Sequence, residues 1–415
     1  MSSGRIQLTT VGVQDALLTE NPEITFFQKR FKRHANFAVE VIDSLFDDVS
    51  IWGKESRCTL QRQGDLINGI WFRIDLPEIG VGSFKYTSTV LKALIEHVDL
   101  NIGGRVIQRI SGEFMDLVDE ITIPEDRQRS LLLNEGKRDT RNGLPIAEAP
   151  YYPATYATNL SFYFRSSTSL AIPLVAIDKQ EIEIIVKLRD FESVTISEDP
   201  TDIAFLPLTP PKIEKTSIIV EYIFITDEEA QFFRANQLDY LITQTQMSQI
   251  SIPASLNSAK FRLNFVNSVK ELFFVVQSNL YTESNIITGN DWFNYTNPSD
   301  PSGHHLKSLS LDLNGERIIH ESVADHLFLH SIQPLKYHTR SPSSRQFYMY
   351  SFALQPENHE PTGQINLSRI QNQLLNMNFY PSTYDRNIRI YAINYNVLRV
   401  KHGIAGLLFI DNNHY

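Results

Sequence analysis

Short runs in which apolar and polar residues alternate recur along the whole chain, and no other feature constrains its fold as much. In "NGIWFRIDL", every second residue is large and apolar, namely Ile70, Phe72, Ile74 and Leu76. A strand with one buried face has this period of two. Similar runs occur at residues 37–43, 97–102, 181–188, 260–266, 308–313, 374–379 and 388–395. Clusters of Pro, Gly, Ser and Asn separate them, so the sequence predicts an all-β protein built as sandwiches or closed barrels.

One segment near the middle of the chain carries the signals of a short helix. In "TDEEAQFFRANQ", Thr226 can cap the first turn, and Glu229 follows three residues later, which is the spacing of a capping box. Asp227 and Glu228 complement the positive end of the helix dipole. We therefore expect a helix to begin after Thr226.

The two halves of the chain resemble each other. "LNIGGRVIQRISGEFMDLV" from Leu100 matches "LDLNGERIIHESVADHLFL" from Leu311, each with a two-residue turn suited to a hairpin. Two further matches pair the stretch from Ile172 with that from Ile365, and the stretch from Val220 with that from Ile393. Because the three matches keep the same order, they favour a tandem duplication of one β-rich domain. A single large β-sandwich without duplication is the alternative.

Bulk composition narrows the classes of function. The 415 residues include 38 Lys and Arg against 48 Asp and Glu, a formal charge of −10, whereas proteins that grip nucleic-acid phosphates usually carry positive binding domains. The length suggests two or three domains. The one cysteine, Cys58, leaves no intrachain disulfide. We expect no membrane span, because no apolar run reaches the roughly 18 to 20 residues needed. We expect no secretory signal, because the N-terminus lacks a charged start followed by an unbroken apolar stretch.

A basic, aromatic stretch, "FFQKRFKRHANF", stands out in this acidic chain. Its cations are Lys29, Arg30, Lys32 and Arg33. Upstream, Asn21 can cap a helix with Pro22 at its first position. On such a helix the apolar side chains of Ile24, Phe27 and Phe31 recur at three- or four-residue steps and would form a buried anchor. Aromatic residues buried in this way could not stack on bases, so we expect the cations to contact an acidic assembly partner; a nuclear-import signal is the alternative.

Residue types that could support chemistry are present but poorly arranged. His326 and His330 are four residues apart, and His304, His305 and His338 lie in the same half. With no second cysteine and no HExxH pattern, we predict surface or interface histidines, no metal site and no cofactor.

The acidic clusters at residues 46–48, 115–120 and 227–229 could supply a carboxylate pair for glycoside hydrolysis. Two of the three are interpreted as solvated helix starts or faces. No nucleophile-elbow, Walker or dinucleotide motif occurs. We predict no catalytic residues and no enzyme, and a polysaccharide-binding or polysaccharide-hydrolysing β-sandwich is the remaining alternative.

Three Asn-x-Ser/Thr sequons are glycosylation candidates of low probability: Asn159, Asn294 and Asn366. A protein assembled in the cytoplasm does not meet the secretory glycosylation machinery. We expect these asparagines to be unmodified.

Longer stretches resemble a known family. "RIQLTTVGVQDALLTENPEITFFQKRFKRHANFAVE" resembles the N-terminal segment of the major capsid proteins of nucleocytoplasmic large DNA viruses. "LIEHVDLNIGGRVIQRISGEFM", "EYIFITDEEAQFF" and "VKELFFVVQ" are also similar to that family, as are "YSFALQPENHEPTGQINLSRIQNQLLNMNF" and "IRIYAINYNVLRVKHGIAGLLF". The resemblance runs nearly end to end.

The resemblance implies a particular all-β architecture, two consecutive eight-stranded antiparallel jelly rolls with a few short helices. It implies an N-terminal segment at the capsomer base (1–24), a first jelly roll (25–226) and a second jelly roll (227–415). Family members form homotrimers whose six rolls give a pseudo-hexagonal capsomer, and many capsomers tile an icosahedral shell. A minor capsid protein of the same fold is the nearest alternative.

The resemblance also implies partners and a location. The expected partners are further copies of the chain, neighbouring capsomers, minor capsid proteins and, as a further candidate, the inner viral membrane surface, with no specific nucleic acid. The expected location is the virion capsid, assembled in the host cytoplasm. At the capsomer base, Lys29, Arg30, Lys32 and Arg33 would be assembly contacts.

Overall fold

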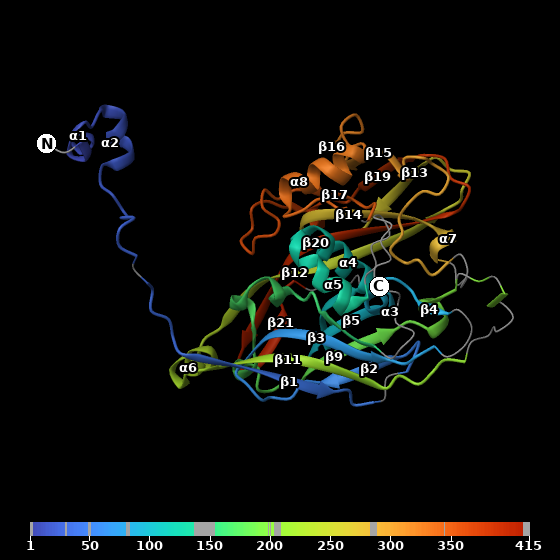
Figure 1. The fold of residues 1–415 in the computed structure, drawn as a ribbon, viewed down its shortest axis with the longest axis horizontal. Helices are drawn as coiled ribbons and strands as arrows, with labels where there is room; N and C mark the ends of the chain where they lie inside the picture. Colours follow the sequence, from blue (N-terminus) through green and yellow to red (C-terminus); the bar gives the residue numbers. More distant parts are fainter. Residues whose placement is uncertain are drawn as a thin grey trace. The chain divides into compact units, whose positions relative to one another are not determined.

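The computed structural model describes residues 3–29, 31–48, 51–79, 84–136, 154–197, 199, 201–202, 209–282, 289–343 and 345–409. The chain divides into two compact units, residues 1–36 and 37–415 (Figure 1). The first unit contains the short helices α1 (Ser3–Thr9) and α2 (Val13–Thr19). All the sheets belong to the second unit.

Two antiparallel sheets form the first half of the larger unit. One has the order β1-β11-β3-β7, with β8 beside β3. Its strands are β1 (Phe37–Leu45), β11 (Lys215–Ile225), β3 (Leu66–Leu76), β7 (Ala154–Asn159) and β8 (Ile172–Pro173). The other has the order β2-β9-β5-β6. Its strands are β2 (Glu55–Thr59), β9 (Ile182–Leu188), β5 (Ile95–Ile102) and β6 (Arg105–Ser111). A small ribbon pairs β4 (Lys85–Tyr86) with β10 (Thr195–Ile196).

Two further antiparallel sheets form the second half. One has the order β12-β20-β14-β17, with β18 beside β14 and β21 beside β20. Its strands are β12 (Leu238–Ile252), β20 (Arg386–Lys401), β14 (Ser268–Ser278), β17 (Tyr348–Ser351), β18 (Ile365–Asn366) and β21 (Ile404–Leu407). The other has the order β13-β19-β15-β16. Its strands are β13 (Ser258–Leu263), β19 (Gln373–Phe379), β15 (Leu306–Leu313) and β16 (Glu316–Ile319).

The same topology occurs twice. When the eight main strands of each half are counted in chain order, both halves have sheets of order 1-8-3-6 and 2-7-4-5. Two four-stranded antiparallel sheets connected in this way form a jelly roll, so the predicted fold class of two consecutive jelly rolls is confirmed. The internal matches are confirmed as well, because the hairpin β5–β6 corresponds to β15–β16, β8–β9 to β18–β19, and β11 to β20.

Short helices connect the strands. They are α3 (Val90–Leu94), α4 (Gly112–Thr122), α5 (Glu125–Glu135), α6 (Asp227–Ala235), α7 (Asn279–Thr282) and α8 (Gln333–Tyr337), the last preceded by a π-helical turn, Phe328–Ile332. Single 3-10 turns lie at Tyr163–Ser166, Thr168–Leu170, Leu174–Ala176, Phe191–Val194 and Leu367–Arg369. Helix α6 is the one predicted after Thr226, but the Thr226 side chain makes no cap hydrogen bond. The acidic residues of its first turn are therefore the feature that stabilises the N-terminal end of the helix, where the helix dipole is positive.

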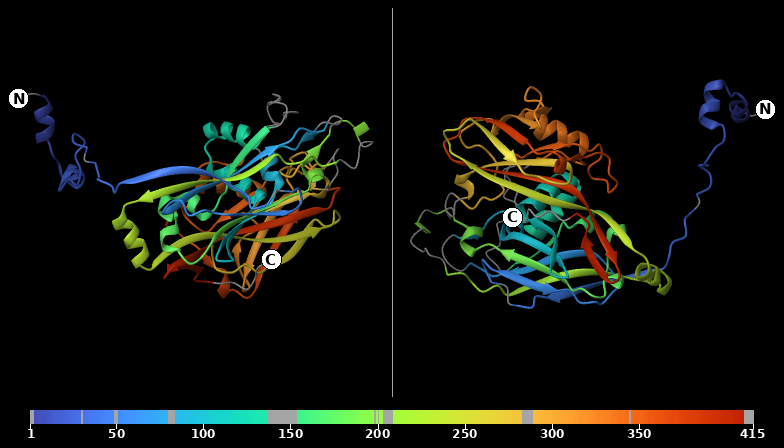
Figure 2. Two further views of the ribbon diagram at one scale, coloured as in Figure 1. Left: turned by 90° about the horizontal axis from the view of Figure 1, so that it is seen from below. Right: turned by 180° about the vertical axis from the view of Figure 1, so that it is seen from behind.

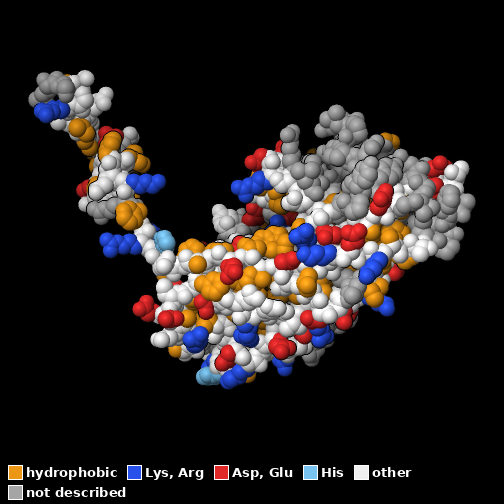
Figure 3. All heavy atoms as spheres, turned by 60° about the horizontal axis from the view of Figure 1, so that its bottom comes forward, with side chains coloured by type: hydrophobic (Ala, Val, Ile, Leu, Met, Phe, Trp, Pro, Cys, Tyr) orange, Lys and Arg blue, Asp and Glu red, His pale blue; other side chains and the backbone are white. Residues whose placement is uncertain are grey.

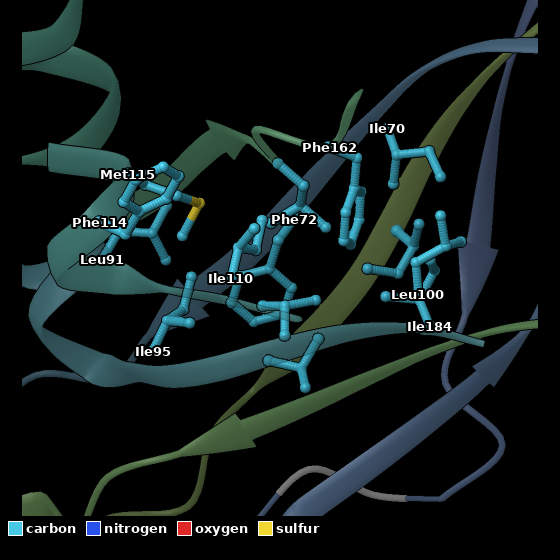
Figure 4. Packing of buried hydrophobic residues seen from close by; sticks show 14 of the residues in the cluster. Ile70, Phe72, Leu91, Ile95, Leu100, Ile110, Phe114, Met115, Phe162 and Ile184 are labelled. Atoms are coloured by element: carbon cyan, nitrogen blue, oxygen red, sulfur yellow. The ribbon is translucent and has the colours of Figure 1, made fainter. Parts of the chain in front are cut away.

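Each roll has its own core. In the first roll, the alternating residues of β3 are at most 1% exposed, as predicted: Ile70, Phe72, Ile74 and Leu76. Figure 4 shows Ile70 and Phe72 facing Leu100 and Ile184, which come from the opposite sheet. Burying a side chain of this size contributes about 1.5–3 kcal/mol. The second roll has a separate core between its own two sheets.

The sheet β12-β20-β14-β17 is covered on both faces. On β14, Phe274 and Val276 belong to the core of the second roll, whereas the intervening Phe273 and Val275 belong to the core that extends from the first roll. A strand buried on both faces cannot alternate apolar with polar residues, which explains the continuous apolar run "LFFVV". The two rolls are thus packed through this sheet, and the helix α4 lies between them (Figures 1 and 2).

Candidate functional site

Helix α4 is the centre of the joint between the two rolls. It follows β6 directly, and the Ser111 Oγ accepts a hydrogen bond from the Phe114 N–H at 3.2 Å as its N-cap. The backbone passes so close to α3 that a β-carbon on Gly112 would lie 2.0 Å from the Lys92 carbonyl oxygen. Glycine is therefore required where the helix begins.

Three acidic side chains of α4 bind arginines of the second roll. The Arg389 guanidinium donates to both Glu113 carboxylate oxygens at 2.6 Å, a bidentate pair. Arg345 Nε lies 2.9 Å from an Asp116 oxygen, and Arg340 lies 3.3 Å from Glu120.

Neutral donors complete the binding of Glu113 and Glu120. The Tyr295 hydroxyl donates to Glu113 at 3.1 Å, and the Tyr391 hydroxyl donates to its other oxygen. The backbone N–H of Ser343 donates to Glu120 at 2.8 Å. These donors come from segments more than 180 residues away in the sequence from the carboxylates that they bind.

The buried arginines of this joint stay charged, and its buried tyrosine stays protonated. Burial alone would lower the pKa of Arg389, but the adjacent Glu113 carboxylate raises that pKa above its usual value. Burial alone would also lower the pKa of Arg345, but the adjacent Asp116 carboxylate raises it above its usual value. Burial raises the pKa of the Tyr391 hydroxyl well above its ordinary range, so it remains a donor. The three ion pairs favour one arrangement of the two rolls, since breaking one of them would leave a buried charge without its partner.

A second set of contacts attaches α4 to its own roll. Buried Lys92 lies 2.6 Å from Asp119 and 2.8 Å from Glu135. Arg165 lies 2.7 Å from the other Asp119 oxygen. The acidic cluster at residues 115–120 is thus buried and structural, whereas the clusters at 46–48 and 227–229 lie at the surface or half-buried, in agreement with the prediction that two of the three are solvated.

The histidines of the second roll are buried more deeply than predicted. His304 lies 4.6 Å from His326 and 5.4 Å from His330 between ring centroids. Burial lowers the pKa of His304 to about 4 and that of His305 to about 3. Since His305 is fully buried, the prediction of a surface or interface position is wrong for it. Within the described ranges, no group of three or more His, Cys, Asp or Glu side chains could hold a metal ion.

His338 lies apart from these rings, between two carboxylates. Its ring nitrogens are 2.9 Å from Glu271 and 3.0 Å from Glu357. Burial alone would lower the pKa of His338, but its hydrogen bonds to Glu271 and Glu357 raise the pKa to about 9. His338 is therefore a buried cation at neutral pH.

The helix predicted around the basic run is not formed. Asn21 has a φ of 55°, so it lacks the extended backbone of an N-cap, and the described residues from 22 to 36 contain no helix. Like charges three or four residues apart, as at Lys29 and Arg33, would repel one another on a helix. A short helix also needs packing to persist.

The role of Ile24, Phe27 and Phe31 as an apolar anchor against the first roll stays a prediction. Within their own unit, their exposed fractions are 72%, 99% and 84%. Lys29, Lys32 and Arg33 are exposed too, and Arg30 lies outside the described residues. The role of these cations as assembly contacts stays a prediction.

The three sequons lie in different surroundings. Asn159 ends the outer strand β7 and is half-buried. The Asn294 side chain is engaged within its loop, donating to Asp291 at 2.8 Å and accepting from Thr296. Asn366 is exposed and caps a 3-10 turn.

Sequence reasoning missed the arginines that bind α4. A signal was present, because the helix repeats acidic residues on one face of an otherwise apolar sequence, Glu113, Asp116 and Glu120. Such a face needs cationic partners if it is buried. Nothing in the sequence alone identifies which cations, 220 to 276 residues further along, would meet it.

Comparisons with known proteins give consistent matches. A family model described as "Major capsid protein N-terminus" matches residues 25–226, and one described as "Large eukaryotic DNA virus major capsid protein" matches residues 229–406. The major capsid protein of Pyramimonas orientalis virus is 28% identical, and that of Phaeocystis pouchetii virus 27%; each alignment covers 99% of this chain and 100% of that protein.

A solved structure has the same fold. The quasi-atomic model of the PBCV-1 virus capsid matches with a TM-score of 0.78 and 22% identity, covering 93% of this chain and 100% of that chain. In addition, none of the helices in the described ranges has the length and apolar character required to cross a membrane.

Proposed function

The chain belongs to the family of large eukaryotic DNA virus major capsid proteins, and from this premise we propose that it forms homotrimeric, pseudo-hexagonal capsomers that tile an icosahedral shell. Its role is structural, in the virion capsid. The observation that carries the proposal is the repetition of one roll topology within the chain. Three copies would supply six similar rolls, which is the number that a pseudo-hexagonal ring requires.

The joint around α4 supports this role. A shell protein transmits load between its two rolls, and the paired charges of Glu113, Asp116 and Glu120 oppose sliding of one roll on the other. No catalytic step is part of the proposal, because these carboxylates are neutralised by arginines.

A division into a segment 1–24, a first roll 25–226 and a second roll 227–415 belongs to the same proposal. Two facts support it. No sheet in the described part of the chain combines strands from both sides of residue 226, and the two family models meet between residues 226 and 229.

The basic run would provide contacts to acidic partners during assembly, in the host cytoplasm. Lys29, Lys32 and Arg33 are exposed, and the neighbouring exposed phenylalanines add apolar area to the same segment. Suitable partners are a neighbouring capsomer, a minor capsid protein or an anionic membrane surface. We expect the sequons to remain unmodified there.

Neutralising the run tests this part of the proposal. A variant with Lys29, Arg30, Lys32 and Arg33 all changed to Gln should form trimers as the wild type does, but should yield fewer closed shells when co-expressed with the other capsid components. A matched control changes the exposed Lys260 and Lys307 to Gln. Wild-type shell yield from the first variant would contradict the assigned role.

Solution mass tests the proposal as a whole. Light scattering on a sizing column should give about 3 × 47.6 = 143 kDa. A stable monomer at micromolar concentration would overturn it.

A further inference from the structure

Each roll has a helical segment after its fifth main strand and a sheet with an outer face. Helix α4 of the first roll already packs on the sheet β12-β20-β14-β17 of the second roll, whereas the segment 323–337 of the second roll and the outer face of β1 in the first roll expose apolar side chains. We propose that the segment 323–337 of the second roll docks on the outer face of the β1-β11-β3-β7 sheet of a neighbouring copy. The contact would repeat between chains the joint that unites the two rolls of one chain. This inference rests on the proposed trimer and identifies the surfaces that would build it.

The joint within the chain is the template. The helix that follows β6 lies against the β12-β20-β14-β17 sheet of the other roll, where the Phe114 and Tyr391 rings are 5.7 Å apart and Glu113 binds Arg389. Phe273 and Val275 of that sheet are fully covered. In this joint, the first roll contributes the helix α4, and the second roll contributes the outer face of its sheet β12-β20-β14-β17.

The second roll has an equivalent helix. Residues 326–337 are helical and follow β16, as α4 follows β6. Asp325 accepts a hydrogen bond from the Phe328 N–H at 2.8 Å, as Ser111 does from the Phe114 N–H. Aligning the two capping residues, Ser111 and Asp325, places Leu327 at the position of Glu113.

The segment 323–337, which contains this equivalent helix, exposes apolar side chains, and one of them, Leu327, takes the position of the largely buried Glu113. The exposed fractions are 55% for Val323, 56% for Leu327, 46% for Ile332 and 73% for Leu335. Such a group of exposed apolar side chains on one short segment marks an interaction surface.

The first roll has the equivalent receiving face. On the outward face of β1, Phe37, Val39, Val41 and Leu45 are 55%, 51%, 57% and 64% exposed, and Asp43 between them pairs with Lys215 of β11. Val39 pairs with Ile223, and Ile219 pairs with Trp71 on the next strand, so apolar side chains continue across β11 and β3, beside Glu221 and the ion pair of Arg73 with Asp75. Figure 3 shows this side of the unit, with hydrophobic side chains gathered over it.

The chemistry of the two joints differs in a way that fixes the order of rolls. Within the chain, an acidic helix meets Arg389 and Arg345; between chains, the exposed apolar side chains of segment 323–337 would meet a sheet face that combines apolar residues with ion pairs. Placing α4 on that face instead would separate its buried carboxylates from their arginines, which is costly.

The arrangement predicts a head-to-tail contact. Helix α8 and strand β1 lie at opposite ends of the larger unit (Figure 1), so one chain cannot satisfy both surfaces by itself. Such a contact uses a different surface on each of the two copies. Copies joined in this way form a closed ring when the rotation from one copy to the next divides a full turn evenly.

A cross-linking experiment tests the contact in the full chain. The double variant Val39→Cys/Leu335→Cys, treated with a short bis-maleimide, should give covalent dimers and trimers on a denaturing gel, and each single variant should give monomers. The native Cys58 is buried, and the wild type serves as the control for it. Cross-linked dimers from a single variant would reveal a two-fold contact and overturn the proposal.

Charge substitutions provide the second test. Val39→Glu and Leu335→Glu should each raise the concentration at which the trimer dissociates by at least about tenfold, whereas Leu256→Glu, at a 44% exposed leucine outside both surfaces, should leave it unchanged. All variants should retain the wild-type unfolding transition, because the three positions are exposed.

The outcomes separate this inference from the proposed function. A wild-type trimer that both glutamate variants leave intact would overturn the assigned surfaces and keep the trimer. If deleting residues 2–36 dissociates the trimer while both glutamate variants leave it intact, the N-terminal segment is the occupant, and the inference is wrong. A monomeric wild type would overturn the proposed function itself.

Discussion

Ion pairs made by arginines of the second roll contribute differently to the free energy of unfolding, and the burial of each pair determines the size of its contribution. Arg389 and Arg399 lie on the same strand, and each makes a bidentate pair with a carboxylate. The Arg389 pair is only 12% and 11% exposed, whereas the Arg399–Asp239 pair is 40% and 41% exposed. Water screens the second pair and not the first.

Replacing Arg389 with Met should therefore destabilise the protein by about 3–5 kcal/mol, because Glu113 would be left as an unpaired buried charge. Replacing Arg399 with Met is the matched control and should cost much less, because water screens this exposed pair. Urea unfolding of both variants measures the difference. Equal losses would mean that the buried pair does not hold the rolls together.

His338 makes stability depend on alkaline pH. Its pKa is about 9 in the folded chain, above the ordinary unfolded value near 6.5, so the folded state binds the proton more tightly. The stabilisation is fully present below about pH 6.5 and is lost as pH rises through 9.

A His338→Gln variant tests this dependence. The gap in unfolding free energy between wild type and variant should be largest near pH 6 and should shrink steadily towards pH 9.5. A gap that does not change over this range would show that Glu271 and Glu357 do not hold a charged imidazole.

At the scale of elements, α4 determines how the two rolls meet. It is attached to the first roll through Lys92 and Arg165 and to the second through three arginines. Its start requires glycine, since Gly112 passes against the Lys92 and Ile95 carbonyl oxygens.

A Gly112→Ala change should cost about 1–3 kcal/mol or more, because the new methyl group would force backbone to move. Gly406→Ala in β21 is the control, since its β-carbon would meet nothing within 4 Å, and it should stay within about 0.5 kcal/mol of the wild type. Thermal unfolding compares them. A loss no larger than that of the control would contradict the close contact between α4 and α3.

Patterns within single elements were predictable, and contacts between distant elements were not. The alternating residues of β3 and the acidic start of α6 are local patterns, so the sequence alone predicted both elements. The duplication was visible because equivalent hairpins kept their turn residues. The segment after Asn21 failed because local capping rules favoured a helix, while the repelling cations and the exposure of Phe27 and Phe31 opposed it. The arginines that bind α4 are remote in sequence and were missed.

At the scale of the whole molecule, the larger unit consists of two rolls of the same topology joined by buried ion pairs. Segment 323–337 and the outer face of β1 expose apolar side chains on different rolls, and in the proposed trimer they would cover each other. Three copies would place six helix-on-sheet contacts around a ring, three within chains and three between chains.

Electron microscopy of the purified protein tests this account most directly. Class averages viewed down the symmetry axis should show closed rings with three-fold symmetry and a pseudo-hexagonal outline, in which six similar lobes alternate between two kinds. Single two-lobed particles, or two-fold dimers, at the same concentration would contradict it.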